Sequence, residues 1–177
     1  MSGPVRAVLL RLLCIGLFLG AYVTAWRPAR DWLSGHVMAP LLARVDTPRA
    51  QQYEIRGAPA RIVEIRRVGA PAEGPPVADM AAPTGLLFVI GSLFLLALFP
   101  THPYWLYLAA YQWSLGAVML GLLAGGVGWV DWGFQAYSFL AEDVYRGTSL
   151  GLPLVFAWWV RRSRTRGASA ASDEAPN

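Results

Sequence analysis

Long uncharged stretches dominate the pattern of hydrophobic and polar positions along this chain. Between Thr84 and Val160, charged side chains occur at only four positions: Asp131, Glu142, Asp143 and Arg146. An arginine cluster follows directly, at Arg161, Arg162, Arg164 and Arg166. A helix that crosses a bilayer needs about 20 apolar residues, and basic residues collect at its cytoplasmic end. The pattern predicts a multi-pass protein of a bacterial inner (cytoplasmic) membrane, with a cytoplasmic C-terminus.

Four apolar segments are expected to cross the membrane: residues 5–26, 80–99, 104–127 and 139–160. The first belongs to an N-terminal part, residues 1–26, for which two interpretations stay open. It is either a retained anchor or a signal peptide cleaved before Trp26. Both leave the C-terminus inside. The other helices form a transmembrane region over residues 84–160. A basic tail follows over 161–177, and its small polar residues from Gly167 onward predict disorder.

Residues 27–83 differ in kind, because arginines are frequent there and acidic residues offset most of their charge. The spacing predicts an amphipathic helix over about 28–45, lying on the outer leaflet and bent near Pro40. Two short strands, 52–56 and 61–68, are expected on either side of a turn at 57–60. Residues 70–83 are rich in Pro, Ala and Gly and are interpreted as a linker. The fold class is therefore an all-α integral membrane protein with about four transmembrane helices and a small extracytoplasmic α+β insertion.

The charges of the two strands predict their register. Placing Glu54 opposite Arg66 and Arg56 opposite Glu64 sets Ile55 opposite the isoleucine of the second strand, Ile65. A shift by two residues would instead put Glu54 opposite Glu64, and like charges facing each other are destabilising. Because a lone hairpin is marginally stable in water, it should pack on the amphipathic helix or on a partner.

Composition narrows the class of function. The chain has 177 residues, a net charge of +4 and 55% hydrophobic residues, and its basic residues are all arginine. These arginines flank apolar segments or lie scattered in one loop, so they indicate membrane topology rather than nucleic-acid binding. The one cysteine, Cys14, excludes an intramolecular disulfide and a cysteine-built metal site.

Five polar residues of the apolar half form the candidate polar or contact site: Gln112, Asp131, Glu142, Asp143 and Arg146. Counted back from Arg161 along a helix, Arg146 lies about 22 Å away and Glu142 about 28 Å away, at the outer interface. Glu142 and Arg146 have the i, i+4 spacing of a helical ion pair. Three interpretations are open: a structural pair, a contact site on the outer face, or part of a proton path.

Other reactive residues give no catalytic, cofactor or metal site. His36 and His102 are expected on opposite sides of the membrane, so they cannot ligate one metal or haem. Cys14 has no base in its own segment and is a poor nucleophile. The glycines at 125–128 follow no strand and precede no lysine, so they indicate a helix end rather than a phosphate loop. We expect no cofactor.

The stretch from Pro83-Thr84-Gly85 to Tyr145-Arg146-Gly147 and Leu154-Val155-Phe156 resembles the catalytic half of the exosortase and archaeosortase membrane transpeptidases. The N-terminal anchor with an outer helix is also similar to the small membrane proteins that accompany exosortases. The resemblance implies a catalytic cysteine, arginine and histidine. At the corresponding places this chain has Thr84, the region 111–113 around Gln112, and Tyr145, so it lacks the catalytic set.

The leading hypothesis is a non-catalytic accessory or assembly subunit of a protein sorting, secretion or envelope system. Its expected partners are the lipid bilayer and another membrane protein, and no nucleic acid. The alternative is a membrane enzyme or transporter with a polar site at the outer membrane interface. The two differ in one observable: an enzyme or transporter requires the five candidate residues to converge on a closed cavity, whereas an accessory protein presents them on its outer surface.

Overall fold

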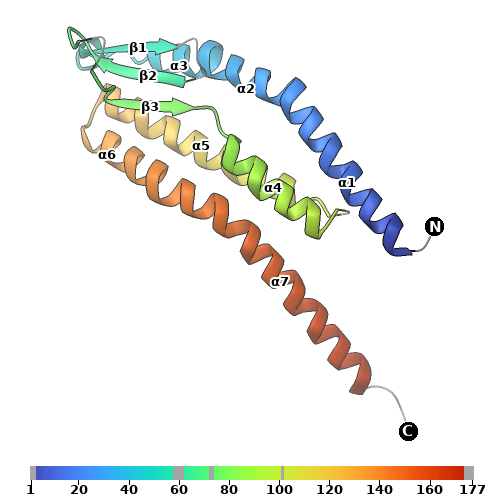
Figure 1. The fold of residues 1–177 in the computed structure, drawn as a ribbon. Coiled ribbons are helices and arrows are strands. Elements are labelled where there is room, and N and C mark those ends of the chain that lie inside the picture. Colours follow the sequence, from blue (N-terminus) through green and yellow to red (C-terminus); the bar gives the residue numbers. More distant parts are fainter. Residues whose placement is uncertain (1–2, 58–61, 72–73, 101, 174–177) are drawn as a thin grey trace.

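The protein consists of long helices with a small antiparallel sheet at one end (Figure 1). The computed structural model describes residues 3–57, 62–71, 74–100 and 102–173. Both chain ends lie away from the sheet, and so does the turn that joins the two central helices, α4 (Leu86–Leu98) and α5 (Tyr104–Gly128). The sheet and the termini therefore mark opposite ends of the molecule.

The N-terminal region is one continuous helix of 39 residues from Val5 to Ala43. Its parts are α1 (Gly3–Ala21), η1 (Tyr22–Trp26), α2 (Arg27–Leu33), η2 (Ser34–Met38) and α3 (Ala39–Ala43). The segments η1 and η2 have π-helical hydrogen bonding. Each comes just before a proline, Pro28 or Pro40, which sits in the first turn of the following α segment. A proline offers no N–H and clashes with the carbonyl four residues back, and a widened turn relieves both problems.

This continuity corrects the expectation of a separate helix lying on the outer leaflet. The helix is about 58 Å long at 1.5 Å per residue, roughly twice the hydrocarbon thickness of a bilayer. Its far part carries the buried residues Ser34, Met38 and Leu42 on one face. That face packs on the sheet and on α5. The apolar spacing thus reports burial against protein, and no break occurs at Pro40.

The sheet has three strands in the order β1 (Tyr53–Gly57), β2 (Ile62–Arg67) and β3 (Ala78–Ala81). The predicted register is confirmed: Ile55 lies opposite Ile65, with Glu54 opposite Arg66 and Arg56 opposite Glu64. The predicted turn at 57–60 lies mostly outside the described residues. The hairpin packs on the N-terminal helix, as its marginal stability requires.

The third strand was missed, because residues 70–83 were interpreted as a linker. Ala78–Ala81 pairs antiparallel with β2, and Met80 lies opposite Val63. Alanine, aspartate and methionine have little intrinsic preference for strands. Pairing with β2 and burial of Ala78 and Met80 produce this strand, and neither is visible in the local sequence.

Among the described residues, two helices are long and apolar enough to cross a membrane: the N-terminal helix and α5. The expected second crossing is shorter than predicted, because Met80 belongs to β3 and the helix α4 starts only at Leu86. Its 13 residues span about 20 Å, less than the roughly 30 Å of a hydrocarbon core.

The last helix runs without interruption from Trp132 through α6 (Trp132–Phe139), η4 (Leu140–Tyr145) and α7 (Arg146–Asp173). The expectation of disorder from Gly167 is wrong as far as Asp173. Alanine-rich residues follow Gly167, and alanine has the highest helix propensity, so the helix continues through them. Residues 174–177 of the predicted tail lie outside the described residues.

Two apolar clusters hold these elements together. One joins the N-terminal helix, the sheet, α5 and α6; its most buried members are Leu42, Val63, Ile65, Leu123 and Val127. The other joins α4, α5 and α7; its buried members are Phe88, Leu95, Tyr104, Leu108 and Val160. Buried polar residues, including Thr84 and Gln112, accompany these clusters.

We predict that Ile65→Ala lowers the free energy of unfolding by roughly 3 kcal/mol, because it opens a cavity at a fully buried position. Val68→Ala is the matched control, since Val68 follows the same strand and is 63% exposed. Chemical unfolding in detergent measures both. Equal losses in the two variants would contradict the placement of the sheet over the core.

Candidate functional site

Gln112, in the middle of α5, is fully buried and links three other parts of the chain. Its Oε1 accepts hydrogen bonds from the backbone N–H of Thr84 (3.1 Å) and the hydroxyl of Tyr145 (3.2 Å). Its Nε2 donates to Oγ of Ser149, which is also fully buried, at 2.9 Å. The side-chain amide is thus satisfied by the β3–α4 connection, by η4 and by α7.

Thr84 is the residue that Gln112 holds, and its backbone is unusual. Its φ angle is 63°, in the left-handed region that β-branched residues rarely enter. Its carbonyl accepts a hydrogen bond from the hydroxyl of Tyr22 (3.3 Å), and its Oγ1 accepts one from Nε1 of Trp26 (2.8 Å). The Thr84 hydroxyl donates to the carbonyl of Pro83. These contacts maintain a conformation that costs about 1–3 kcal/mol.

Arg30, two helical turns beyond Tyr22, completes the polar cluster. Its Nη1 donates to the Tyr22 hydroxyl at 3.4 Å, and within the described part of the chain this is the only hydrogen bond of the Arg30 guanidinium. Its Nε is buried and has no partner there. A Cβ at Gly85 would lie 3.4 Å from Nη1, so the guanidinium rests against the start of α4.

Of the five predicted site residues, Asp131 lies apart from the rest. It pairs with Arg49, whose Nε donates to the carbonyl of Gly126 at 3.1 Å. Thr47 donates to the carbonyl of Gly128 at 2.9 Å. The loop before the sheet thereby caps the C-terminus of α5. The hydrogen bond from Arg49 lowers the pKa of Asp131, so the pair contributes at neutral pH and is lost as the pH falls through that lowered value.

Glu142, Asp143 and Arg146 are exposed on the last helix. Among the described residues no ion pair joins Glu142 to Arg146, in contrast to the i, i+4 expectation. Residues Leu140–Tyr145 are π-helical, which interrupts the regular spacing on which that expectation rests. Exposed ion pairs also gain little over hydration. Gln112 is buried, so the five candidates do not converge.

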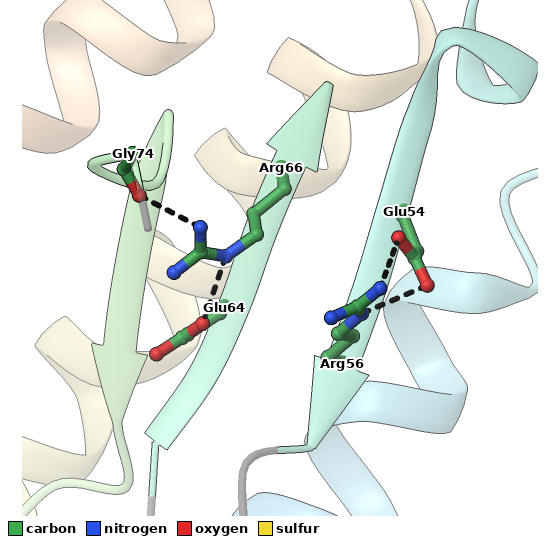
Figure 2. A network of polar contacts seen from close by, with 5 residues as sticks. All are labelled: Glu54, Arg56, Glu64, Arg66 and Gly74. Atoms are coloured by element: carbon green, nitrogen blue, oxygen red, sulfur yellow. Dashed lines mark hydrogen bonds and ion pairs between the residues drawn. The ribbon is translucent and has the colours of Figure 1, made fainter. Parts of the chain in front are cut away.

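Charged residues of β1 and β2 lie on the outer face of the sheet (Figure 2). Arg56 forms two hydrogen bonds of 2.8 Å to the carboxylate of Glu54, and Arg66 pairs with Glu64 at 3.1 Å. Each ion pair joins two residues of the same strand, Glu54 and Arg56 in β1 and Glu64 and Arg66 in β2. The register also places opposite charges face to face across the two strands. Arg56 lowers the pKa of Glu54. Arg66 also donates to the carbonyl of Gly74 (2.7 Å), which ties down the segment before β3.

Two cavities flank the polar cluster. One, of about 720 Å³, is an apolar groove between the N-terminal helix and α4–α5; among its lining residues are Cys14, Phe18, Tyr22, Trp26, Trp105 and Trp113. The other, of about 460 Å³, lies between β3, the start of α4 and the last helix; its charged and aromatic lining residues are Arg30, Asp79, Tyr137, Glu142, Tyr145 and Arg146. We call them the apolar groove and the polar cavity.

The remaining reactive residues form no shared site. His36 stacks on Trp32, with ring centroids 5.1 Å apart, whereas His102 stacks on Tyr104 at 4.3 Å. Cys14 lines the apolar groove, and neither histidine is among the residues that line it. Among the described residues no group of three or more His, Cys, Asp or Glu could hold a metal ion.

Sequence reasoning identified Gln112 but missed most of its surroundings. Tyr22, Trp26 and Arg30 recur every four residues, which puts a hydroxyl, an indole N–H and a guanidinium on one helical stripe. That spacing was a usable signal. Nothing local indicated Ser149, whose burial depends on how α7 packs against α4 and α5.

Comparison of the chain with protein-family models, curated proteins and solved structures found no match in any of the three. Function must therefore be inferred from the geometry of the chain itself.

We predict that Gln112→Leu lowers the free energy of unfolding by roughly 3 kcal/mol, because it leaves the buried N–H of Thr84 and hydroxyl of Ser149 without their partner. Ser114→Ala is the control in the same helix: Ser114 is exposed and bonds only to the carbonyl of Ala110. Both are measured by unfolding in detergent. A Gln112→Leu protein as stable as the control would show that the amide does not hold the cluster together.

Proposed function

We propose that this chain is a non-catalytic multi-pass membrane protein that serves as an accessory or assembly subunit of a protein sorting, secretion or envelope system. The observation that carries the proposal is the scatter of the candidate residues. Glu142, Asp143 and Arg146 are exposed, and Asp131 pairs with Arg49 at the end of α5. The side-chain amide of Gln112 is fully used in internal hydrogen bonds. Exposed charged residues next to a small sheet form a contact surface rather than a reaction centre.

The chemistry of the buried cluster supports the same conclusion. Thr84, Gln112 and Tyr145 stand where the exosortase resemblance would require cysteine, arginine and histidine, and they do share one hydrogen-bonded cluster. A threonine nucleophile needs an adjacent base. The hydroxyl of Thr84 instead contacts Trp26 and the carbonyl of Pro83, and neither can remove its proton.

We further propose that four helices cross a bacterial inner membrane, with the sheet outside and the C-terminus in the cytoplasm. The arrangement in Figure 1 supports this topology, because both termini and the α4–α5 turn lie opposite the sheet. The short helix α4 would then rely on its longer neighbours and on local thinning of the bilayer.

A membrane enzyme or transporter with a site at the outer interface is the second candidate. The polar cavity favours it, since Glu142, Tyr145 and Arg146 share that lining. The charged residues Glu142 and Arg146 are exposed, however, whereas a catalytic or transport site would need charged groups that are shielded from water.

Topology is tested by single cysteines introduced into a Cys14→Ala background. A membrane-impermeant maleimide added to spheroplasts should label Glu54→Cys, on the sheet, and should label His102→Cys, in the α4–α5 turn, only after lysis. Abundance should be unaffected by Cys14→Ala, because Cys14 lies in an apolar groove without a nearby base. Labelling of His102→Cys in intact spheroplasts would reverse the proposed orientation.

The accessory role is tested by replacing Asp143 with the photo-cross-linker p-benzoylphenylalanine in the native host. We expect one discrete protein adduct on irradiation, because Asp143 is exposed and lies outside the lining of the polar cavity. Leu150, on the same helix and 48% exposed, is the matched control and should give no protein adduct. Equal adducts at both positions, or none at Asp143, would argue against a partner at this surface.

A further inference from the structure

Arg30 carries a positive charge that the protein does not neutralise. Within the described part of the chain no carboxylate pairs with it, and the single hydrogen bond of its guanidinium is a long one to the neutral hydroxyl of Tyr22. Its Nε is buried without a partner. A guanidinium offers five N–H donors, and leaving a partly buried charge without hydrogen bonds is costly. The guanidinium could therefore be stabilised by a bound anion.

The surroundings of Arg30 favour an oxyanion. Its guanidinium rests against Gly85, the residue that precedes α4, and no side chain caps that helix. The first turn of a helix leaves N–H groups without intrahelical partners and carries a partial positive charge. Arg146 adds a second cation to the same polar cavity. The two carboxylates of the lining, Asp79 and Glu142, are exposed to solvent, and neither pairs with Arg30.

The apolar groove lies next to this candidate anion site. Tyr22 lines the groove and Arg30 lines the polar cavity, so the hydrogen bond between these two side chains marks where the two spaces adjoin. From Trp26 and Trp113, whose rings meet edge-to-face at 6.1 Å, the groove extends to Leu96 and Pro100 near the α4–α5 turn. Paired tryptophans beside a cation are typical of the headgroup level of a membrane, with acyl chains alongside the helices below.

We propose that the two spaces together bind one anionic phospholipid of the outer leaflet. Its phosphate would accept hydrogen bonds from Arg30 and lie at the start of α4, and one acyl chain would occupy the apolar groove. The groove volume of about 720 Å³ falls within the range of ordinary ligand pockets. This lipid site is separate from the exposed contact surface around Asp143, and either can exist without the other.

The test uses the full chain in mild detergent, with bound lipid counted by native mass spectrometry. Dioleoyl phosphatidylglycerol should bind saturably, one molecule per chain. Dioleoylglycerol, which has the same acyl chains but no phosphate, should bind at least about tenfold more weakly, the effect of losing one charge-assisted hydrogen bond. Inorganic phosphate should raise the melting temperature less than phosphatidylglycerol does.

Two variants separate the phosphate contact from the acyl contact. Arg30→Gln should weaken phosphatidylglycerol binding by about tenfold, whereas Arg27→Gln, an exposed arginine on the same helix, should not. Leu106→Trp narrows the apolar groove and should also weaken the binding of phosphatidylglycerol. Val118→Trp is its control, because Val118 is 54% exposed, close to the 49% of Leu106, and lies on the same helix but outside the groove.

Unchanged phosphatidylglycerol binding in Arg30→Gln, or equal binding of dioleoylglycerol, would overturn the proposal. The proposal would also be wrong if inorganic phosphate raised the melting temperature as much as phosphatidylglycerol and Leu106→Trp had no effect on lipid binding. The site would then bind a free anion. If Arg30→Gln fails to fold, the comparison of the three ligands and the Leu106→Trp variant still decide the matter.

Discussion

The hydrogen bonds of one buried amide, that of Gln112, fix how the parts of this protein meet. Its oxygen and nitrogen reach the β3–α4 connection, η4 and α7 from a single position on α5. In an apolar interior an unpaired amide costs several kcal/mol, so the elements must approach in the one arrangement that satisfies it. The amide sets their register.

The geometry of Thr84 follows from that constraint. With its N–H directed to Gln112 and its carbonyl to Tyr22, the residue is held at positive φ, and the chain turns from β3 into α4. The connection then crosses α5 at Gly116, where any Cβ would collide with Pro83. This turn leaves Gly85 facing Arg30 and opens the polar cavity beside it. The backbone strain at Thr84 thus positions the start of α4 against a cation.

The sequence predicted the parts of this structure that depend on local pattern. Charge alternation gave the register of Ile55 and Ile65, and apolar runs gave the positions of most helices. The failures have two causes, contact between distant segments and local adjustment of the backbone. Ala78–Ala81 becomes a strand only by pairing with β2, and the helix continues past Pro28 and Pro40 because π-helical turns widen before them. Of the candidate site, Gln112 stood out as a lone polar residue, whereas its partners come from segments far apart in the chain.

The arginines of this protein fall into two groups, those paired with a carboxylate and those without such a partner. Arg49, Arg56 and Arg66 each have a carboxylate partner and serve to fasten the loop and the sheet. Arg30 has none among the described residues, yet it is less exposed than Arg27, one turn earlier on the same helix. A cation retained without a partner at the boundary of an apolar groove costs desolvation energy that folding does not recover. In the proposed lipid complex, a bound phosphate would recover this energy, and the apolar groove would hold the acyl chain of the same molecule. The lipid would then stabilise the junction between the N-terminal helix and α4, to which Gln112 already fixes α5 and α7.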